Sequence, residues 1–381
     1  MLHIDNNLDN PFIISKIIPE PLFCDRDEET SYLIKQIVNG RNVVLISPRR
    51  MGKTGLIHHL FRQPEISKKY ITFFIDIYST TSLQEFCYTF GKAVFEQLKP
   101  KKKQYWESFV RTIKSLQPGI SIDAITGEPR FDLGIGAISN PTATLEEIFT
   151  YLESAPKPCI VAFDEFQQIS DFPEKRVEAL LRGFMQNCSK TSFIFSGSKQ
   201  HTMSQMFHSK ARPFYQSAQI MELKPLKKEV YSQFAKRLFK KHAKTLDTNV
   251  VEQIYEDFEG TTWYMQMLMN ELFAITKSGG TCTQEQIPIA KNNIIEVQEG
   301  SYQMQMSNLS QKQKALLQAI AREGQARAIT SAAFVKRHAL NSPSSVQSSV
   351  KGLIEKDVVS ADNGCYRISD YFFSEWIKKT F

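Results

Sequence analysis

The chain has 381 residues, of which 42% are hydrophobic and 23% are charged, and its formal net charge is +7. This length exceeds one ordinary hydrophobic core, and the composition is that of a soluble globular protein, so we expect two or three domains. The small positive excess permits an anionic partner without requiring one. No apolar run approaches the roughly 20 residues of a membrane-spanning helix, which argues against a membrane protein.

The cysteines and the N-terminal residues indicate the cellular compartment. Six cysteines are scattered along the chain with no close pairs, which argues against both a zinc site and a disulfide framework and suits a reducing cytosol. The first residues are polar and lack the apolar stretch of a signal peptide. We therefore expect a cytoplasmic protein with no membrane partner.

Residues 8–29 contain several prolines and turn-forming residues, which predicts an extended lead-in that docks on a domain. A helical pattern follows from Arg26 to Val38 and ends at Asn39-Gly40. The lead-in therefore precedes one helix and then the first apolar strand.

Residues 42–56 have the layout strand, loop and helix that is typical of a phosphate-binding P-loop. Lys53 would reach the β and γ phosphates and contribute to catalysis, and Thr54 would bind Mg²⁺ through its hydroxyl. Backbone N–H groups at the start of the helix would face the phosphates. Ser47 occupies the position of the usual first glycine. The residues expected to bind the nucleotide here are Ser47, Pro48, Arg49, Arg50, Met51, Gly52, Lys53, Thr54 and Gly55.

Strands alternating with helices predict a parallel α/β sheet in the first part of the chain. The expected strands are 43–46, 70–78, 159–163, 191–195 and 219–223, and the expected helices are 82–99, 144–153 and 174–188. Residues 119–138 read as a β-hairpin inserted into this fold, with its turn at Thr126–Pro129. The basic run 99–103 is most simply a solvated charged loop.

Two acids follow the third expected strand, over 100 residues after the P-loop. Carboxyl ends of parallel strands meet at one sheet edge, so Asp164 would lie near Thr54 and join the Mg²⁺ shell as a Walker B residue. Glu165 would accept a proton from the attacking water, or at least orient it. An alternative is that both acids cap the next helix.

Three further sets of residues carry more than one interpretation. Ser196, in Ser196-Gly-Ser198, either senses the γ-phosphate or is a plain polar strand end. Arg212 either reaches the transferring phosphoryl group, in its own subunit or a neighbour's, or forms a structural ion pair. Arg49 and Arg50 either contact phosphate or a carboxylate, or are solvated.

The pattern of expected helices and strands changes twice in the C-terminal part of the chain. Residues 227–308 read as a helical subdomain. From residue 309, three helices are followed by a two-stranded hairpin with its turn at Asp362-Asn363-Gly364, which predicts a winged helix-turn-helix. We therefore divide the chain into 1–226, 227–308 and 309–381.

The chain resembles the archaeal-type ATPases of the STAND/AAA+ group of P-loop NTPases. The resemblance spans nearly the whole chain and rests on Pro21–Phe23 with Arg26 and Glu29, Ser47–Thr54, Ile160–Ile169, Phe195–Ser198, Arg212–Tyr215 and Tyr366–Trp376. It implies an AAA+-like core with ATP and Mg²⁺ as cofactors. It also implies that Phe23 and Arg26 belong to a segment packed over the adenine, and that residues 227–308 form a lid over the nucleotide.

Our leading hypothesis is a Mg²⁺-dependent ATPase that acts as a nucleotide-driven conformational switch and binds ATP and ADP. A second hypothesis is a nucleotide-gated regulator whose winged helix binds DNA; as an alternative, that domain docks on protein. A third is a scaffold that binds nucleotide without hydrolysis, as Ser47 and Asp25 suggest. Oligomers that form on ATP binding are compatible with each hypothesis.

Overall fold

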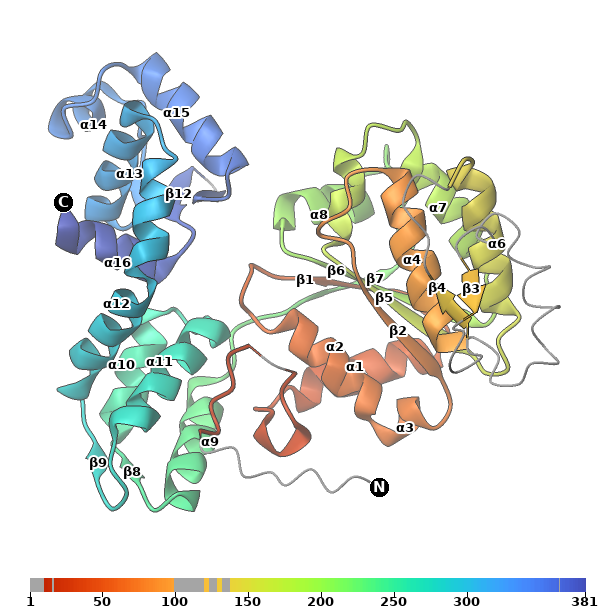
Figure 1. Ribbon diagram of the computed structural model, residues 1–381, viewed down its shortest axis with the longest axis horizontal. Coiled ribbons are helices and arrows are strands. Elements are labelled where there is room, and N and C mark those ends of the chain that lie inside the picture. Colours follow the sequence, from red (N-terminus) through yellow and green to blue (C-terminus); the bar gives the residue numbers. More distant parts are fainter. Residues whose placement is uncertain (1–9, 16, 99–119, 123–128, 132–137, 363) are drawn as a thin grey trace. The chain divides into compact units, whose positions relative to one another are not determined.

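The computed structural model describes residues 10–15, 17–98, 120–122, 129–131, 138–362 and 364–381. The chain forms two compact units (Figure 1). The first unit comprises residues 15–227 together with 261–263. The second comprises 228–260 and 264–381 together with the described residues of the segment 1–14. The division at 226 and 308 remains a prediction, and the basic run 99–103 lies outside the described residues.

A five-stranded parallel sheet forms the centre of the first unit, in the order β2-β5-β6-β1-β7. The predicted parallel α/β sheet is therefore confirmed. The strands are β1 (Val43–Ile46), β2 (Ile71–Asp76), β5 (Cys159–Asp164), β6 (Thr191–Gly197) and β7 (Gln219–Glu222). The carboxyl ends of β1, β2, β5 and β6 thus meet at one edge, which carries the P-loop and both Walker B acids.

Side chains alternate between the two faces of this sheet and join a separate hydrophobic cluster on each face. Helices cover both faces (Figure 1). Val43 and Leu45 join the cluster that includes Leu33 and Leu56, whereas Val44 and Ile46 join the opposite cluster. The nearly continuous apolar strands in the sequence follow from this burial on both faces. The helices of this unit are α1 (Asp27–Val38), α2 (Lys53–Arg62), α3 (Pro64–Ser67), α4 (Leu83–Leu98), α6 (Pro141–Glu153), α7 (Val177–Gln186) and α8 (Gln200–His208).

Short elements also belong to the first unit, among them a 3₁₀ segment η1 (Glu20–Leu22) in the lead-in. A 3₁₀ segment, η5 (Phe166–Asp171), follows β5 directly. Strands β3 (Ile120–Ile122) and β4 (Pro129–Phe131) pair antiparallel within the stretch expected to form a hairpin. Of the expected turn, residues 126–128 lie outside the described residues, and Pro129 belongs to β4 and not to the turn.

The second unit is mainly helical, with a small parallel pair formed by β8 (Thr245–Leu246) and β9 (Thr281–Cys282) that the sequence did not suggest. Phe12 is fully buried here against Phe234, Phe239 and Phe273, so this part of the lead-in docks among the helices. The helices are α9 (Lys228–Lys241), α10 (Thr248–Asp257), α11 (Thr262–Ile275, which begins with two residues of the first unit) and α12 (Gln286–Ser307).

The predicted winged helix is confirmed at the C-terminal end of this unit. It contains α13 (Gln311–Glu323), α14 (Ala332–Arg337), α15 (Pro343–Glu355), β10 (Ala326–Arg327), β11 (Val359–Asp362), β12 (Cys365–Ile368) and α16 (Tyr371–Thr380). The three strands form a sheet in the order β10-β12-β11. Ser342 caps α15 by accepting a hydrogen bond from the Ser345 N–H. In the described part of the chain, no helix is both long and apolar enough to cross a membrane.

Candidate functional site: a P-loop nucleotide site

The P-loop joins β1 to α2 through backbone conformations that few side chains tolerate. Gly52, with φ of 92°, directly precedes α2, and a side chain there would be strained. Lys53 is 5% exposed, and its Nζ donates to the carbonyl oxygens of Ser47 at 2.9 Å and Pro48 at 3.0 Å. The hydroxyl of Ser47 lies 3.4 Å from the same ammonium group. The serine at the first glycine position therefore adds a polar group inside the loop.

Burial lowers the pKa of Lys53, although the nearby carboxylates of Glu165 and Asp164 raise it. A charged group removed from water is costly unless other charges compensate for it. Since polyphosphate oxygens supply such compensation, the ammonium group is placed to bind an anion strongly.

Thr54 and Asp164 meet across the sheet edge, as the sequence predicted. The Thr54 hydroxyl donates to Oδ2 of Asp164 at 2.7 Å, and the N–H of Glu165 donates to Oδ1 at 3.1 Å. One hydroxyl and one carboxylate form a hard oxygen donor set that fits Mg²⁺, which keeps several waters and takes further ligands from phosphates. Among the described residues, no three His, Cys, Asp or Glu side chains group as a metal site. A magnesium ion would therefore need ligands from the nucleotide.

Glu165 lies at the end of β5 in the left-handed region, with φ of 54°. Its Oε2 accepts hydrogen bonds from the Ser198 hydroxyl at 2.6 Å and from Nε2 of Gln167 at 2.5 Å. Ser196, predicted to sense phosphate, is fully buried within β6, and its hydroxyl has no hydrogen-bond partner among the described residues. Within the Ser196-Gly-Ser198 motif, Ser198 is the residue that contacts Glu165.

Asp76 belongs to the same sheet edge, although the sequence analysis did not select it. It ends β2 directly opposite Asp164 in the parallel register. Desolvation of its carboxyl group raises its pKa, as do the charges of Asp164 and Glu165, while the hydrogen bond from the Tyr78 N–H lowers it. The rule that parallel strand ends converge would have identified Asp76 from the sequence.

The middle of the P-loop is contacted by the short segment 261–263, which belongs to the same unit. The N–H of Trp263 donates to the carbonyl of Arg50 at 3.0 Å, and the Thr262 hydroxyl donates to the carbonyl of Met51 at 3.4 Å. The Arg50 guanidinium also lies over the Trp263 ring, 4.5 Å from its centroid. Sequence reasoning did not anticipate these contacts, since about 200 residues separate the partners.

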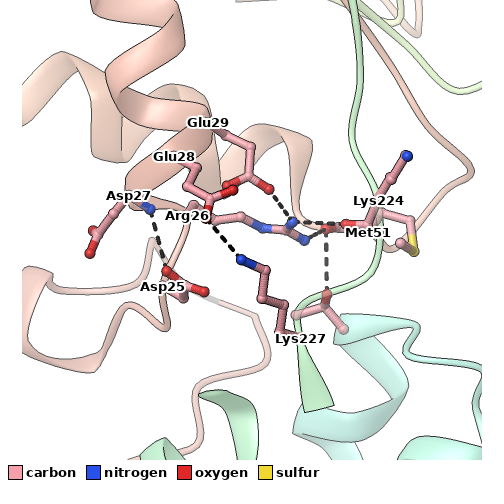
Figure 2. A network of polar contacts seen from close by, with 9 residues as sticks. Asp25, Arg26, Asp27, Glu28, Glu29, Met51, Lys224 and Lys227 are labelled. Atoms are coloured by element: carbon pink, nitrogen blue, oxygen red, sulfur yellow. Dashed lines mark hydrogen bonds and ion pairs between the residues drawn. The ribbon is translucent and has the colours of Figure 1, made fainter. Parts of the chain in front are cut away.

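Arg26 converges on the same loop (Figure 2). Its guanidinium donates to Glu29 at 2.7 Å, to the Lys224 carbonyl at 2.8 Å and to the Met51 carbonyl at 3.4 Å. Arg26 is 4% exposed and adopts a φ of 85°. The guanidinium therefore ties the start of α1 to the P-loop and to the segment after β7, through protein groups alone. Direct nucleotide contact by Arg26 remains a prediction.

Phe23 lies beside the helix that follows the P-loop. Its ring stacks on His59 with centroids 4.2 Å apart, and a Cβ atom on Gly55 would lie 3.5 Å from the Phe23 ring. Glu20 fixes this segment, because its carboxylate pairs with His59 at 3.1 Å. The structure thus places Phe23 at the P-loop helix, while its predicted contact with adenine remains a prediction.

The remaining predicted arginines have protein partners. Arg49 lies over the Tyr78 ring at 5.3 Å. Arg212 forms an ion pair with Glu178 of α7, which is the structural alternative considered for it. Burial raises the pKa of Glu178, and the charge of Arg212 opposes this shift. A catalytic role for Arg212 remains a prediction.

Comparison with known proteins identifies the family. Residues 23–268 match a family described as an ATPase domain predominantly from Archaea. The chain belongs to this family. Residues 300–379 also match a probable winged helix domain. An uncharacterised ATP-binding protein of Methanocaldococcus jannaschii is 27% identical over 160 residues, which are 39% of this chain and 44% of that protein. The chain thus spans less than half of this relative's length.

Solved structures show the same fold. A Walker-type ATPase of Pyrococcus abyssi has a TM-score of 0.62 at 18% identity, covering 97% of this chain and 99% of that chain. The ORC2 protein of Aeropyrum pernix, solved with ADPNP and ADP, has a TM-score of 0.57 at 14% identity and coverages of 97% and 95%. The ORC1 protein of the same organism, solved with DNA, has a TM-score of 0.54 at 13% identity and coverages of 93% and 92%. The chain therefore combines an ATPase domain of this family, with an AAA+-like fold, and a C-terminal winged helix.

Proposed function

We propose that this protein binds ATP with Mg²⁺, hydrolyses it slowly to ADP and phosphate, and uses the nucleotide to switch conformation in the cytoplasm. The observation that carries the proposal is the convergence of Lys53, Thr54, Asp164 and Glu165 at one sheet edge, with Thr54 and Asp164 in direct contact. A helix N-terminus, a buried ammonium group and two carboxylates are the parts that phosphoryl transfer requires.

Each residue has a distinct task in this proposal. N–H groups at the start of α2 and the Lys53 ammonium bind and orient the phosphates. The water oxygen bonds to the γ-phosphorus, the bond to the bridging oxygen breaks, and ADP leaves with that oxygen. Glu165 takes the proton that the water loses. Bound Mg²⁺, held by Thr54 and Asp164, would neutralise phosphate charge.

The segment 261–263 supports the switch. Thr262 and Trp263 donate to P-loop carbonyls within the first unit, and the next residue, Tyr264, belongs to the second unit. The Tyr264 hydroxyl donates to the Ser369 carbonyl at 3.1 Å and accepts from the Tyr371 N–H at 3.0 Å, beside the winged helix. A change in the P-loop backbone that accompanies nucleotide binding would therefore act directly on the start of α11.

Phosphate release and thermal shift with ATP or GTP, with and without Mg²⁺, test the proposal. We expect Mg²⁺-dependent phosphate release from ATP that falls sharply in Lys53→Ala and Glu165→Gln, with a slow residual rate in Glu165→Gln. Glu165→Gln should still bind ATP, because Glu165 acts on water. Wild-type protein that ATP fails to stabilise would reject ATP binding. Tight ATP binding without phosphate release would instead favour the non-hydrolysing scaffold.

Arg212 needs a separate test for its proposed role in hydrolysis. If its guanidinium reaches the phosphoryl group, Arg212→Ala will lower turnover and leave ATP affinity nearly unchanged, whether it acts within one subunit or across subunits. Light scattering with ATP shows whether the protein assembles. Unchanged turnover would leave the ion pair with Glu178 as its role.

DNA binding through the winged helix is a second candidate function. Helix α15 exposes Ser344, Gln347, Ser348 and Lys351, which can reach base edges or phosphates. The similar ORC1 protein has been solved with DNA. A gel shift of duplex DNA at low salt, weakened in Lys351→Glu, would support this function. No shift at low salt would reject it and favour docking on protein.

A further inference from the structure

The backbone conformation of Glu165 is the first of three observations about the Walker B end of the site. Glu165 has φ of 54° and ψ of 41°. A non-glycine residue in this left-handed region is uncommon and persists only where its surroundings favour it. The conformation ends β5 abruptly, and η5 begins at the next residue. The surroundings of Glu165 therefore hold its backbone in this conformation.

The second observation is that two donors hold one oxygen of this glutamate. The Ser198 hydroxyl and Nε2 of Gln167 both bond to Oε2, at 2.6 Å and 2.5 Å. Hydrogen bonds to a carboxylate are charge-assisted and stronger than neutral ones. Together they restrain rotation of the carboxylate.

The third observation is that Gln167 is itself held firmly. Its side chain is 1% exposed, and its backbone carbonyl accepts from the Ser170 hydroxyl at 2.7 Å. A Cβ atom on Gly197 would lie 2.5 Å from Oε1 of Gln167 and 2.5 Å from Cγ of Met203. A side chain at position 197 would therefore require Gln167 or Met203 to shift. Ser198 directly follows that glycine, so both donors come from one closely packed junction of β6 and η5.

We propose that Ser198 and Gln167 are positioning residues that hold the Glu165 carboxylate for proton transfer from water. This inference rests on the proposed ATP hydrolysis. Alignment of a base within a few tenths of an ångström strongly affects rate, so loss of the restraint should lower kcat while ATP binding persists. The competing arrangement is that Ser198 bonds directly to the γ-phosphate or to the water, independently of Glu165.

A double-mutant cycle separates these two arrangements. In the full-length protein, Ser198→Ala should lower kcat about ten- to a hundredfold, with KM for ATP changed by less than about twofold. In the Glu165→Gln background, the rate is measured by single-turnover phosphate release. There Ser198→Ala should lower the rate by less than about twofold, because the restrained carboxylate is already absent. Gln167→Leu should give the same pattern, and Ser198→Thr, which keeps the hydroxyl, should restore most of the rate.

The matched control is Ser189→Ala, which also removes a serine hydroxyl bonded to a carboxylate, that of Glu153, on the exposed surface of the same unit. It should leave kcat unchanged. Equal losses from Ser198→Ala in both backgrounds would overturn the inference and assign Ser198 to the phosphate or the water. An unchanged kcat in Ser198→Ala would overturn it too. Absence of turnover in the wild type would instead reject the proposed hydrolysis, and the inference with it.

Discussion

The sheet edge of the ATPase core and the winged helix hold their charges in different ways. Lys53 and Asp164 are 5% and 6% exposed, and each has several polar partners. The Arg367 side chain of the wing, by contrast, is 43% exposed in its pair with Glu259 at 2.8 Å. Lys351 and Glu355 on α15 are more exposed still, at 80% and 65%.

This difference separates charges that are buried among polar partners from charges that lie in exposed ion pairs. Burying an ammonium group and carboxylates costs stability unless a ligand or a dense set of partners compensates. Exposed ion pairs contribute little to the free energy of unfolding, so their residues can be replaced with little loss of stability. Substitutions at the sheet edge should therefore change ATP turnover strongly, whereas the loss of an exposed ion pair at the wing should change ATP turnover and stability little.

The largest effect should come from Lys53→Met. We expect ATP turnover to fall about a hundredfold or more, since this ammonium group faces the charge that develops in the transition state. Thermal stability without nucleotide should stay equal or rise, because burial disfavours the charged lysine. Phosphate release and thermal melting measure both effects. The control Lys69→Met, at an exposed lysine of the same unit, should change neither ATP turnover nor thermal stability. A loss of thermal stability in Lys53→Met would contradict this account.

The metal dependence should be the next largest effect. Asp164→Asn should raise the Mg²⁺ concentration needed for half-maximal turnover about tenfold or more, because one anionic ligand is lost. Removal of Mg²⁺ with a chelator should stop turnover of the wild type. A titration of phosphate release against Mg²⁺ checks this, with Asp171→Asn as a control at an exposed carboxylate. Equal Mg²⁺ requirements in Asp164→Asn and wild type would argue against this metal site.

The segment at the P-loop should give an intermediate effect. Trp263→Ala removes the ring under the Arg50 guanidinium, and such contacts are worth about 0.5–2 kcal/mol. The variant should weaken ATP binding up to about tenfold and abolish ATP-dependent hydrogen-exchange protection in α11. Trp263→Phe, which keeps an aromatic ring, should have an ATP affinity and a degree of protection between those of the wild type and those of Trp263→Ala. Full protection in Trp263→Ala would show that the switch does not run through this residue.

The pH dependence of stability follows from Lys53. Its pKa is lowered below the ordinary value of 10.5, so the folded protein bears the cost of the charged form at neutral pH. That cost declines as pH rises through the lowered pKa toward 10.5. The stability advantage of Lys53→Met over wild type should therefore be largest near neutral pH and shrink in alkaline solution, as urea unfolding would show. An advantage that grows with pH would contradict the sign of this shift.

The smallest effect should come from the wing. Glu259→Gln breaks the exposed ion pair with Arg367. We expect a change in the free energy of unfolding within about 0.5 kcal/mol and unchanged ATP turnover. Urea unfolding and phosphate release test both statements. A loss of stability several times larger would mean that this pair holds the wing against α10 and is not a mere surface contact.

The sequence by itself determined the parallel sheet, the P-loop, the Walker B acids and the winged helix. These features depend on local periodicity and on the rule that parallel strands end at one edge, so residues far apart in the chain could be placed together. The family match confirms the fold that this reasoning reached.

Apart from the contact between Thr54 and Asp164, only the tertiary structure decided which of these side chains touch. Ser196 and Ser198 look equivalent in the sequence, but Ser196 lies within β6, enclosed by its neighbours, while Ser198 lies just past the strand end and reaches Glu165. The contact of Trp263 with the P-loop likewise spans about 200 residues. Side-chain contacts of this kind follow from where each strand ends and how closely its neighbours pack, which periodicity does not specify.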